Sequence, residues 1–141
     1  MQWLANAENA RNFAKQISPF FEARGFAVLA YCLMPDHAHL LLEGVVETAD
    51  LAEAMRAWKQ RTGYDWKRRH GTRLWQEGFH DRVLRAEDDT AAVVRYVLEN
   101  PLRARLVSLV TDYPWIGSSR YSIEQLIEGS APWKPSWKRN R

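Results

Sequence analysis

The sequence predicts an α+β domain in which an antiparallel sheet has helices on both of its faces. Three long segments repeat hydrophobic residues at helical spacing, and short apolar segments rich in strand formers lie between them. The chain has 141 residues, of which 46% are hydrophobic, and this suffices for one ordinary domain with its own core. We therefore expect residues 1–141 to form a single domain, with residues 130–141 as a basic, flexible tail.

The first half of the chain predicts a helix, a strand hairpin and a second helix. Residues 6–24 repeat alanine, phenylalanine and isoleucine at helical spacing, and a glycine follows where a helix would end. Residues 26–33 are apolar at every position, which is typical of a buried central strand. A Pro-Asp turn then leads residues 37–43 back as the second strand of a hairpin. Residues 48–69 predict the second helix, with its lysines and arginines on the outer face.

The second half predicts a further strand and two more helices. Residues 79–84 favour a strand, residues 87–100 a helix that Pro101 ends, and residues 123–128 a short helix. The order α-β-β-α-β-α would complete a ferredoxin-like βαββαβ fold if one more strand preceded the first helix. Residues 1–5 are too few to supply a good strand. We therefore expect a ferredoxin-like sheet that lacks its first strand.

Cysteine content and hydropathy indicate the compartment. Cys32 is the one cysteine of the chain, which excludes an internal disulfide framework and is ordinary in a reducing compartment. The sequence has neither an apolar run near 18 residues nor a basic start followed by an apolar segment. These features predict a cytoplasmic protein with no membrane partner.

Positive charge is concentrated in two stretches. Residues 56–73 carry a net charge of +6 and residues 131–141 carry +4, so the remainder of the chain carries −7. Such segregation is typical of a polyanion-binding surface, although a solvated helix face and a frayed tail would give the same pattern. The candidates for contacts to a DNA backbone are Lys59, Arg61, Lys67, Arg68, Arg69, Lys138, Arg139 and Arg141.

Seven tryptophans are many for a chain of this length, and five of them flank the basic stretches. An indole face can stack on an unpaired base, as proteins that bind single strands require. We expect at least three of the seven to pack in the core instead. Trp75 and Trp137 are the candidates for stacking on a base.

Two histidines separated by one residue lie on the predicted second strand. Because side chains alternate along a strand, His37 and His39 share one face, roughly 7 Å apart at the Cα. Two imidazoles at this separation can bind one metal ion, although they could equally pack or form hydrogen bonds on a half-buried sheet. No further His or Cys spacing completes a four-ligand zinc site. The pair therefore favours an open site with room for substrate.

A tyrosine and an asparagine lie one turn apart on the predicted third helix. Tyr96 and Asn100 are at positions i and i+4, so they share a face. The amide oxygen of Asn100 could be a third metal ligand, and the phenol of Tyr96 could act as a nucleophile beside it. The alternative is that Tyr96 is simply a packing residue of that helix.

Four segments together resemble one family. AYCLMPDHAHLLLE, WQEGFHDRVLR, RYVLENPLRARLV and YPWIGSSRY, within residues 26–121, resemble the REP-associated tyrosine transposases. These are single-tyrosine members of the HUH endonuclease superfamily. The resemblance implies that His37 and His39 are the paired metal ligands, Asn100 the third ligand and Tyr96 the nucleophile. It also implies Mg²⁺ or Mn²⁺ as cofactor, and single-stranded DNA beside a hairpin as substrate.

The activity implied by the resemblance is cleavage and strand transfer through a 5′-phosphotyrosine, by a nucleoid-associated monomer or homodimer. The sequence departs from the family in the expected absence of the first strand. It also has Arg105 where the family typically has glycine. Two alternatives stay open: a hairpin-binding module that no longer cuts, and a metal-binding protein without a nucleic-acid partner.

Overall fold

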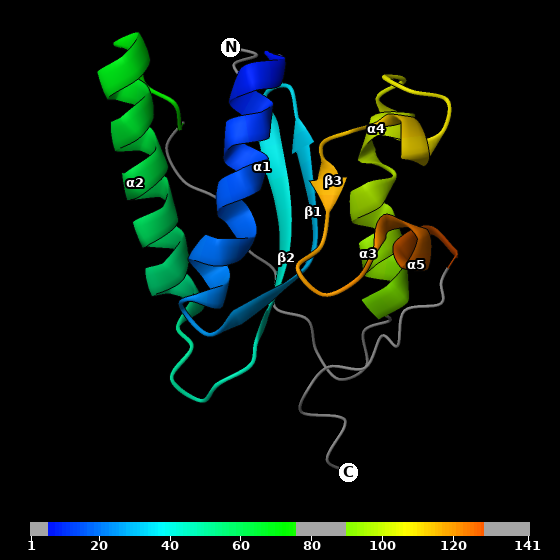
Figure 1. Cartoon of the computed structure of the whole chain (residues 1–141), viewed down its shortest axis with the longest axis horizontal. Helices are drawn as coiled ribbons and strands as arrows, with labels where there is room; N and C mark the ends of the chain where they lie inside the picture. The colour runs from blue at the N-terminus through cyan, green and yellow to red at the C-terminus, as the bar shows by residue number, and fades with distance from the viewer. Residues whose placement is uncertain (1–5, 76–89, 129–141) are drawn as a thin grey trace.

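The computed structural model describes residues 6–75 and 90–128, and these form an α+β fold (Figure 1). Its elements in chain order are α1 (Ala7–Glu22), β1 (Phe26–Met34), β2 (His37–Gly44), α2 (Leu51–His70), α3 (Thr90–Leu98), α4 (Asn100–Arg103), the 3-10 helix η2 (Val110–Asp112), β3 (Ile116–Gly117) and α5 (Ile123–Glu128). This confirms the predicted fold class. Residues 1–5, the predicted strand at 79–84 and the tail at 130–141 lie outside the described residues.

The described strands form an antiparallel sheet in the order β2-β1-β3. β1 is buried at every position except the half-buried Tyr31, which confirms the prediction of a central strand. β3 was not expected, because its two residues lie in a segment rich in turn residues. Pairing with β1 makes it a strand: Gly117 stands opposite Tyr31, and the backbone N–H of Leu33 donates to the carbonyl of Trp115 at 2.9 Å.

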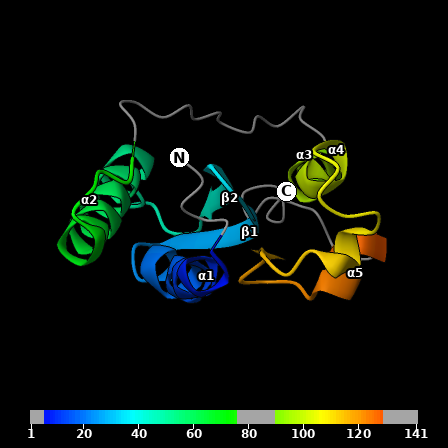
Figure 2. The same cartoon turned by 90° about the horizontal axis from the view of Figure 1, so that it is seen from above.

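A β-bulge in β1 sets which residues face each side of the sheet. Val28 stands opposite Leu42 and Ala30 opposite Leu41, so Leu29 is the extra residue. Before the bulge Val28 packs with α1 and α2, and after it Leu33 does the same, whereas Leu29 packs with α3 on the other face. Helices therefore cover both faces, as predicted (Figure 2).

Helices α1 and α2 are joined by aromatic packing. Trp58 of α2 is 3% exposed, and its ring centroid lies 5.1 Å from that of Phe20 and 5.4 Å from that of Phe21. α2 begins at Leu51, three residues later than predicted, because the Asp50 side chain caps it by accepting a hydrogen bond from the N–H of Glu53 at 3.1 Å. None of the described helices combines the length and apolarity needed to cross a bilayer.

The third predicted helix is divided in two. α3 ends at Leu98, and α4 begins at Asn100 with Pro101 in its first turn. The prediction that the third helix runs to Asn100 and is ended by Pro101 was therefore wrong: α3 ends earlier, and Pro101 lies inside the next helix. Proline is tolerated in the first turn of a helix, where its missing N–H would have no intrahelical partner. Pro101 thus starts a new short helix directly after α3.

The close approach of β3 to β1 predicts a destabilising substitution. A Cβ added at Gly117 would lie 2.6 Å from Oη of Tyr31 and 2.7 Å from its ring carbons. We expect Gly117→Ala to lower the free energy of unfolding by about 1–3 kcal/mol, since the ring must move to relieve the overlap. Urea denaturation measures this. Gly63→Ala is the matched control, because its Cβ would meet Trp75 at an ordinary 3.4 Å within a helix. An equal loss in both variants would contradict the steric explanation.

The end of α4 contains a strained arginine. Arg105 has a φ of 59°, and the N–H of Leu106 donates to the carbonyl of Pro101 at 2.9 Å, in a helix-ending motif in which glycine is usual. We expect Arg105→Gly to raise the free energy of unfolding by about 1 kcal/mol by relieving this strain. Thermal or urea unfolding tests it. Arg105→Ala keeps the Cβ and should give no such gain; an equal gain would mean that the exposed guanidinium, rather than the backbone, is unfavourable.

Candidate active site

The two histidines lie at the start of β2, on the face of the sheet that α3 covers. Leu41 shares their face and packs in the cluster that includes Val94 and Val97 of α3. Leu40 and Leu42 pack instead on the side of α1 and α2. The strand therefore alternates as predicted, and this alternation puts both imidazoles on the side of the third predicted helix.

The histidine pair converges through its Nε2 atoms. Nε2 of His37 lies 3.0 Å from Nε2 of His39, and the ring centroids are 4.8 Å apart. On its other side, Nδ1 of His37 lies 2.6 Å from Oδ1 of Asp36. Because a carboxylate can only accept, this contact favours the proton on Nδ1 and makes Nε2 of His37 an acceptor, which here lies at hydrogen-bond distance from Nε2 of His39. Asp36, which the sequence suggested only as a turn residue, thus orients His37.

The donor atoms of the pair fit a divalent metal ion. Two ligands at about 2.1 Å and 90° in an octahedral shell lie about 3.0 Å apart, which matches the distance between the two Nε2 atoms. Burial, followed by the charges of His37 and Arg103, lowers the pKa of His39. A lowered pKa favours the neutral imidazole, which is the form that binds metals. Among residues 6–75 and 90–128, no third His, Cys, Asp or Glu side chain completes a metal-binding group with the pair.

Tyr96 lies in the last turns of α3 and is accessible. Its side chain is among the exposed aromatic ones, with 60% relative exposure. The alternative that Tyr96 is a packing residue is therefore wrong: Val94, Val97 and Leu98 form the buried face of α3. The guanidinium carbon of Arg103 lies 4.0 Å from the centroid of the Tyr96 ring. An exposed phenol beside a fixed cation is open to a substrate.

Asn100 ties the end of α3 together. Pro101 has no N–H for the carbonyl of Val97, and Nδ2 of Asn100 donates to that carbonyl at 2.9 Å and to the carbonyl of Tyr96 at 3.4 Å. Both bonds engage the amide nitrogen, so Oδ1 is the atom that could hold a metal. The structure thus relates Asn100 to Tyr96, and its role as third metal ligand stays a prediction.

Arg103 lies beside Tyr96, and the sequence interpretation missed it. Besides stacking on Tyr96, its charge acts at His39 and at Cys32, whose pKa burial raises to about 12 against the opposing effect of Arg103. His39 and Cys32 both lie on the face of the sheet that α3 covers. No helical spacing could have indicated it, because α3 ends at Leu98 and Arg103 lies in α4.

The predicted DNA contacts on α2 lie at the other end of the molecule from α3 (Figures 1 and 2). The side chains of Arg61, Lys67, Arg68 and Arg69 are exposed, and Lys59 is half-buried. Trp75 is half-buried as well: its Nε1 donates to Oγ1 of Thr62 at 2.8 Å, and its ring packs edge-on against Phe13 with the ring centroids 6.1 Å apart. Trp75 therefore contributes to the packing of α1 and α2, and base stacking by it stays a prediction. Lys138, Arg139 and Arg141 lie outside the described residues.

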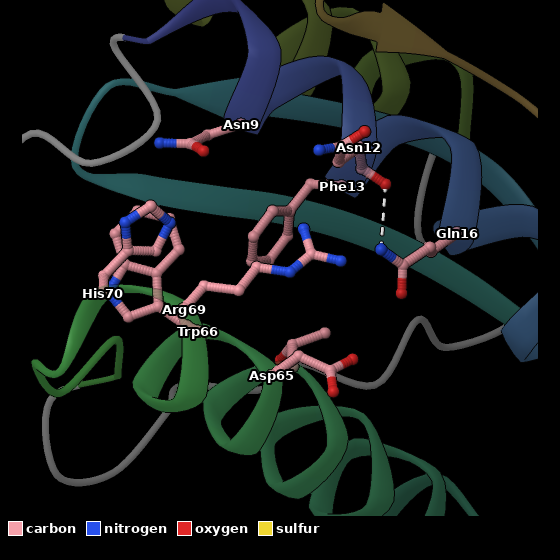
Figure 3. A pocket seen from close by; sticks show the side chains of 9 residues that line it. Asn9, Asn12, Phe13, Gln16, Asp65, Trp66, Arg69 and His70 are labelled. Atoms are coloured by element: carbon pink, nitrogen blue, oxygen red, sulfur yellow. Dashed lines mark hydrogen bonds between the residues drawn. The ribbon is translucent and has the colours of Figure 1, made fainter.

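A pocket between α1 and α2 lies on the opposite side of the sheet from the histidines (Figure 3). Polar side chains from both helices line it: Asn9, Asn12, Gln16, Asp65, Arg69 and His70. The ring of His70 lies on that of Trp66, with centroids 3.9 Å apart. Because the pocket shares no residue with the histidine pair or α3, it is not part of the candidate active site.

Comparison with known proteins identifies the family. The family model described as "Transposase IS200 like" matches residues 2–100, a stretch that contains both histidines, Tyr96 and Asn100. A Haemophilus influenzae protein named "Putative REP-associated tyrosine transposase" is 26% identical over 102 residues, which are 64% of this chain and 57% of that protein. The chain thus spans less than two thirds of that relative, and no solved structure matches. With the family model covering well over half of its length, the chain belongs to the IS200-like transposase family.

Proposed function

We propose that this protein is a metal-dependent endonuclease and strand transferase for single-stranded DNA beside a hairpin. One observation carries the proposal: the converging histidine nitrogens lie on the side of the sheet that α3 covers, and α3 is the helix with the exposed Tyr96. Membership of a transposase family supports DNA as the substrate. The name of the Haemophilus relative supports a tyrosine as the nucleophile and an association with REP sequences.

His37 and His39 would hold a Mg²⁺ or Mn²⁺ ion through Nε2, with Oδ1 of Asn100 as a third ligand. The hydrogen bond to Asp36 fixes the ring of His37, as such contacts do for metal-binding histidines. When bound, the ion supplies positive charge that polarises the scissile phosphate and steadies the leaving oxygen.

Tyr96 would carry out the covalent step. Its Oη attacks the phosphorus in line, so that an Oη–P bond forms while the bond from phosphorus to the 3′ oxygen breaks. The phenol gives up its proton to solvent, and the departing 3′ oxygen takes one up. The products are a 5′-phosphotyrosine and a free 3′-hydroxyl. One phosphodiester replaces another, so a 3′-hydroxyl can reverse the step without ATP.

The basic side chains of α2 would bind the DNA backbone away from the reacting phosphate. Arg61, Lys67, Arg68 and Arg69 are exposed on that helix, and Lys138, Arg139 and Arg141 would add to them from the tail. Phosphate contacts of this kind give affinity that falls as salt rises and carry little sequence information. We therefore expect them to hold a hairpin stem, leaving recognition of the cleavage site to other groups.

The test is a covalent-adduct assay. Folded protein is mixed with single-stranded hairpin oligonucleotides from the flanks of its own gene in the presence of Mn²⁺, and the products are separated on a denaturing gel. We expect a slowly migrating protein–DNA band that a chelator abolishes and that Tyr96→Phe lacks completely, because phenylalanine has no nucleophilic oxygen.

Tyr64→Phe is the matched control for this assay. Tyr64 lies on α2 and is 68% exposed, close to the 60% of Tyr96. Loss of the Tyr64 hydroxyl should leave the protein–DNA band intact. A band that persists in Tyr96→Phe would assign the nucleophile elsewhere. Folded protein that shifts the hairpin on a native gel, yet never forms the band, would instead be a hairpin-binding module.

A further inference from the structure

We propose that Arg103 is a positioning residue that holds the ring of Tyr96 in place for attack, an inference that rests on the proposed function. The guanidinium of Arg103 lies over the Tyr96 ring, with its carbon 4.0 Å from the ring centroid. Nη2 of the same guanidinium donates to the backbone carbonyl of Tyr96. Arg103 thus contacts both the side chain and the main chain of the nucleophile.

The local backbone explains why an arginine can do this. Carbonyls in the last turn of a helix have no intrahelical partner, and the Tyr96 carbonyl is bound by side chains from α4 instead. Glu99 also lies near Arg103, with Oε2 4.0 Å from Nη1. The guanidinium thus has the carbonyl, the ring and a carboxylate as neighbours. Its planar fork can stack and donate at once, which the single ammonium of lysine does less well.

Tyr96, which Arg103 contacts, belongs to the helix that covers the histidine side of the sheet. The orientation of the tyrosine ring therefore matters for a reaction at the proposed metal site. An exposed tyrosine samples several rotamers, and an attacking oxygen misplaced by about 1 Å can cost about a hundredfold in rate. Fixing the ring before DNA arrives would reduce that loss. The family model ends at residue 100, so its match does not include this residue.

The first experiment asks whether Arg103 holds the ring, with no need for DNA cleavage. Protein labelled with ¹³C in its tyrosine rings is observed by NMR, and Tyr96→Phe assigns the Tyr96 signal. We expect Arg103→Ala to shift and sharpen that signal while leaving Tyr31 and Tyr113 unchanged. Arg95→Ala removes the same charge from an exposed site on α3 and should not move it. A Tyr96 signal that is the same with and without Arg103 would overturn the proposal.

The second experiment separates positioning from DNA binding. Single-turnover adduct formation is measured at saturating DNA, and affinity is measured in the unreactive Tyr96→Phe background. We expect Arg103→Ala to lower the rate about 10- to 100-fold with less than about a threefold change in Kd, and Arg95→Ala to change neither. Arg103→Lys should keep the affinity without restoring the rate.

Three results would contradict the role of Arg103 in this second experiment. A loss confined to Kd would make Arg103 a DNA-binding residue, full rescue by lysine would mean that charge alone matters, and an unchanged rate in Arg103→Ala would exclude any part in the reaction. Thermal melting confirms that each variant is folded. If the unsubstituted protein forms no adduct, the proposed function fails, and the NMR result still decides whether Arg103 holds the ring.

Discussion

His39→Ala is expected to lower the rate of metal-dependent DNA cleavage by about a thousandfold. A bound metal ion stabilises the transition state of a phosphoryl transfer by several kcal/mol, and each 1.36 kcal/mol is tenfold in rate. His39 supplies one of the two Nε2 atoms that converge at 3.0 Å, and its loss leaves a single imidazole. Its side chain is only half-buried, so we expect the fold to survive.

Two measurements check this prediction: the rate of adduct formation and the affinity for Mn²⁺ determined by calorimetry. Asp36→Asn should give a smaller loss of metal affinity, about 10- to 100-fold, because it weakens only the orientation of His37. His70→Ala removes an exposed histidine on the opposite side of the sheet and should leave Mn²⁺ affinity unchanged. Metal affinity that survives in His39→Ala would place the metal elsewhere.

Trp58→Ala is expected to have the largest effect on stability, lowering the free energy of unfolding by about 3–5 kcal/mol. The indole is 3% exposed and contacts the rings of Phe13, Phe20 and Phe21, which are the aromatic side chains of α1 at this interface. A small domain is stable by only about 5–15 kcal/mol, so the loss is a large part of the total. The cavity would open between the two helices that cover one face of the sheet.

Urea denaturation followed by far-UV circular dichroism measures the loss. Tyr64→Ala is the matched control: it deletes a large aromatic side chain from the same helix, but that side chain is 68% exposed. We expect a change within about 0.5 kcal/mol there. If both variants lose the same free energy, the loss does not come from the packing of Trp58 on α1.

The parts of the fold that depend on neighbours in sequence were predictable. The apolar stretch of β1, the Pro-Asp turn and the alternation of β2 follow from local patterns, and the structure has all three. Tyr96 and Asn100 were predicted on one helix, but the structure places Tyr96 in α3 and Asn100 at the start of α4. The predicted start of α2 was three residues too early, and the break between α3 and α4 was not predicted, because helix ends depend on single side chains such as Asp50 and Asn100.

The sequence by itself determined which residues share a face. A strand has a period of two, so His37 and His39 had to point the same way, wherever the strand was placed. The strained arginine at position 105 was also readable as a departure from glycine, and its φ is 59°. These properties are set within a few residues of chain, and no distant contact can reverse them without breaking the element itself.

Only the tertiary structure decided what those faces meet. Ser119 binds the bulge of β1 through hydrogen bonds to Val28 across 91 residues of chain, β3 becomes a strand by pairing with β1, and α3 covers the histidine side. Each of these contacts depends on how separate elements pack, which local periodicity does not encode.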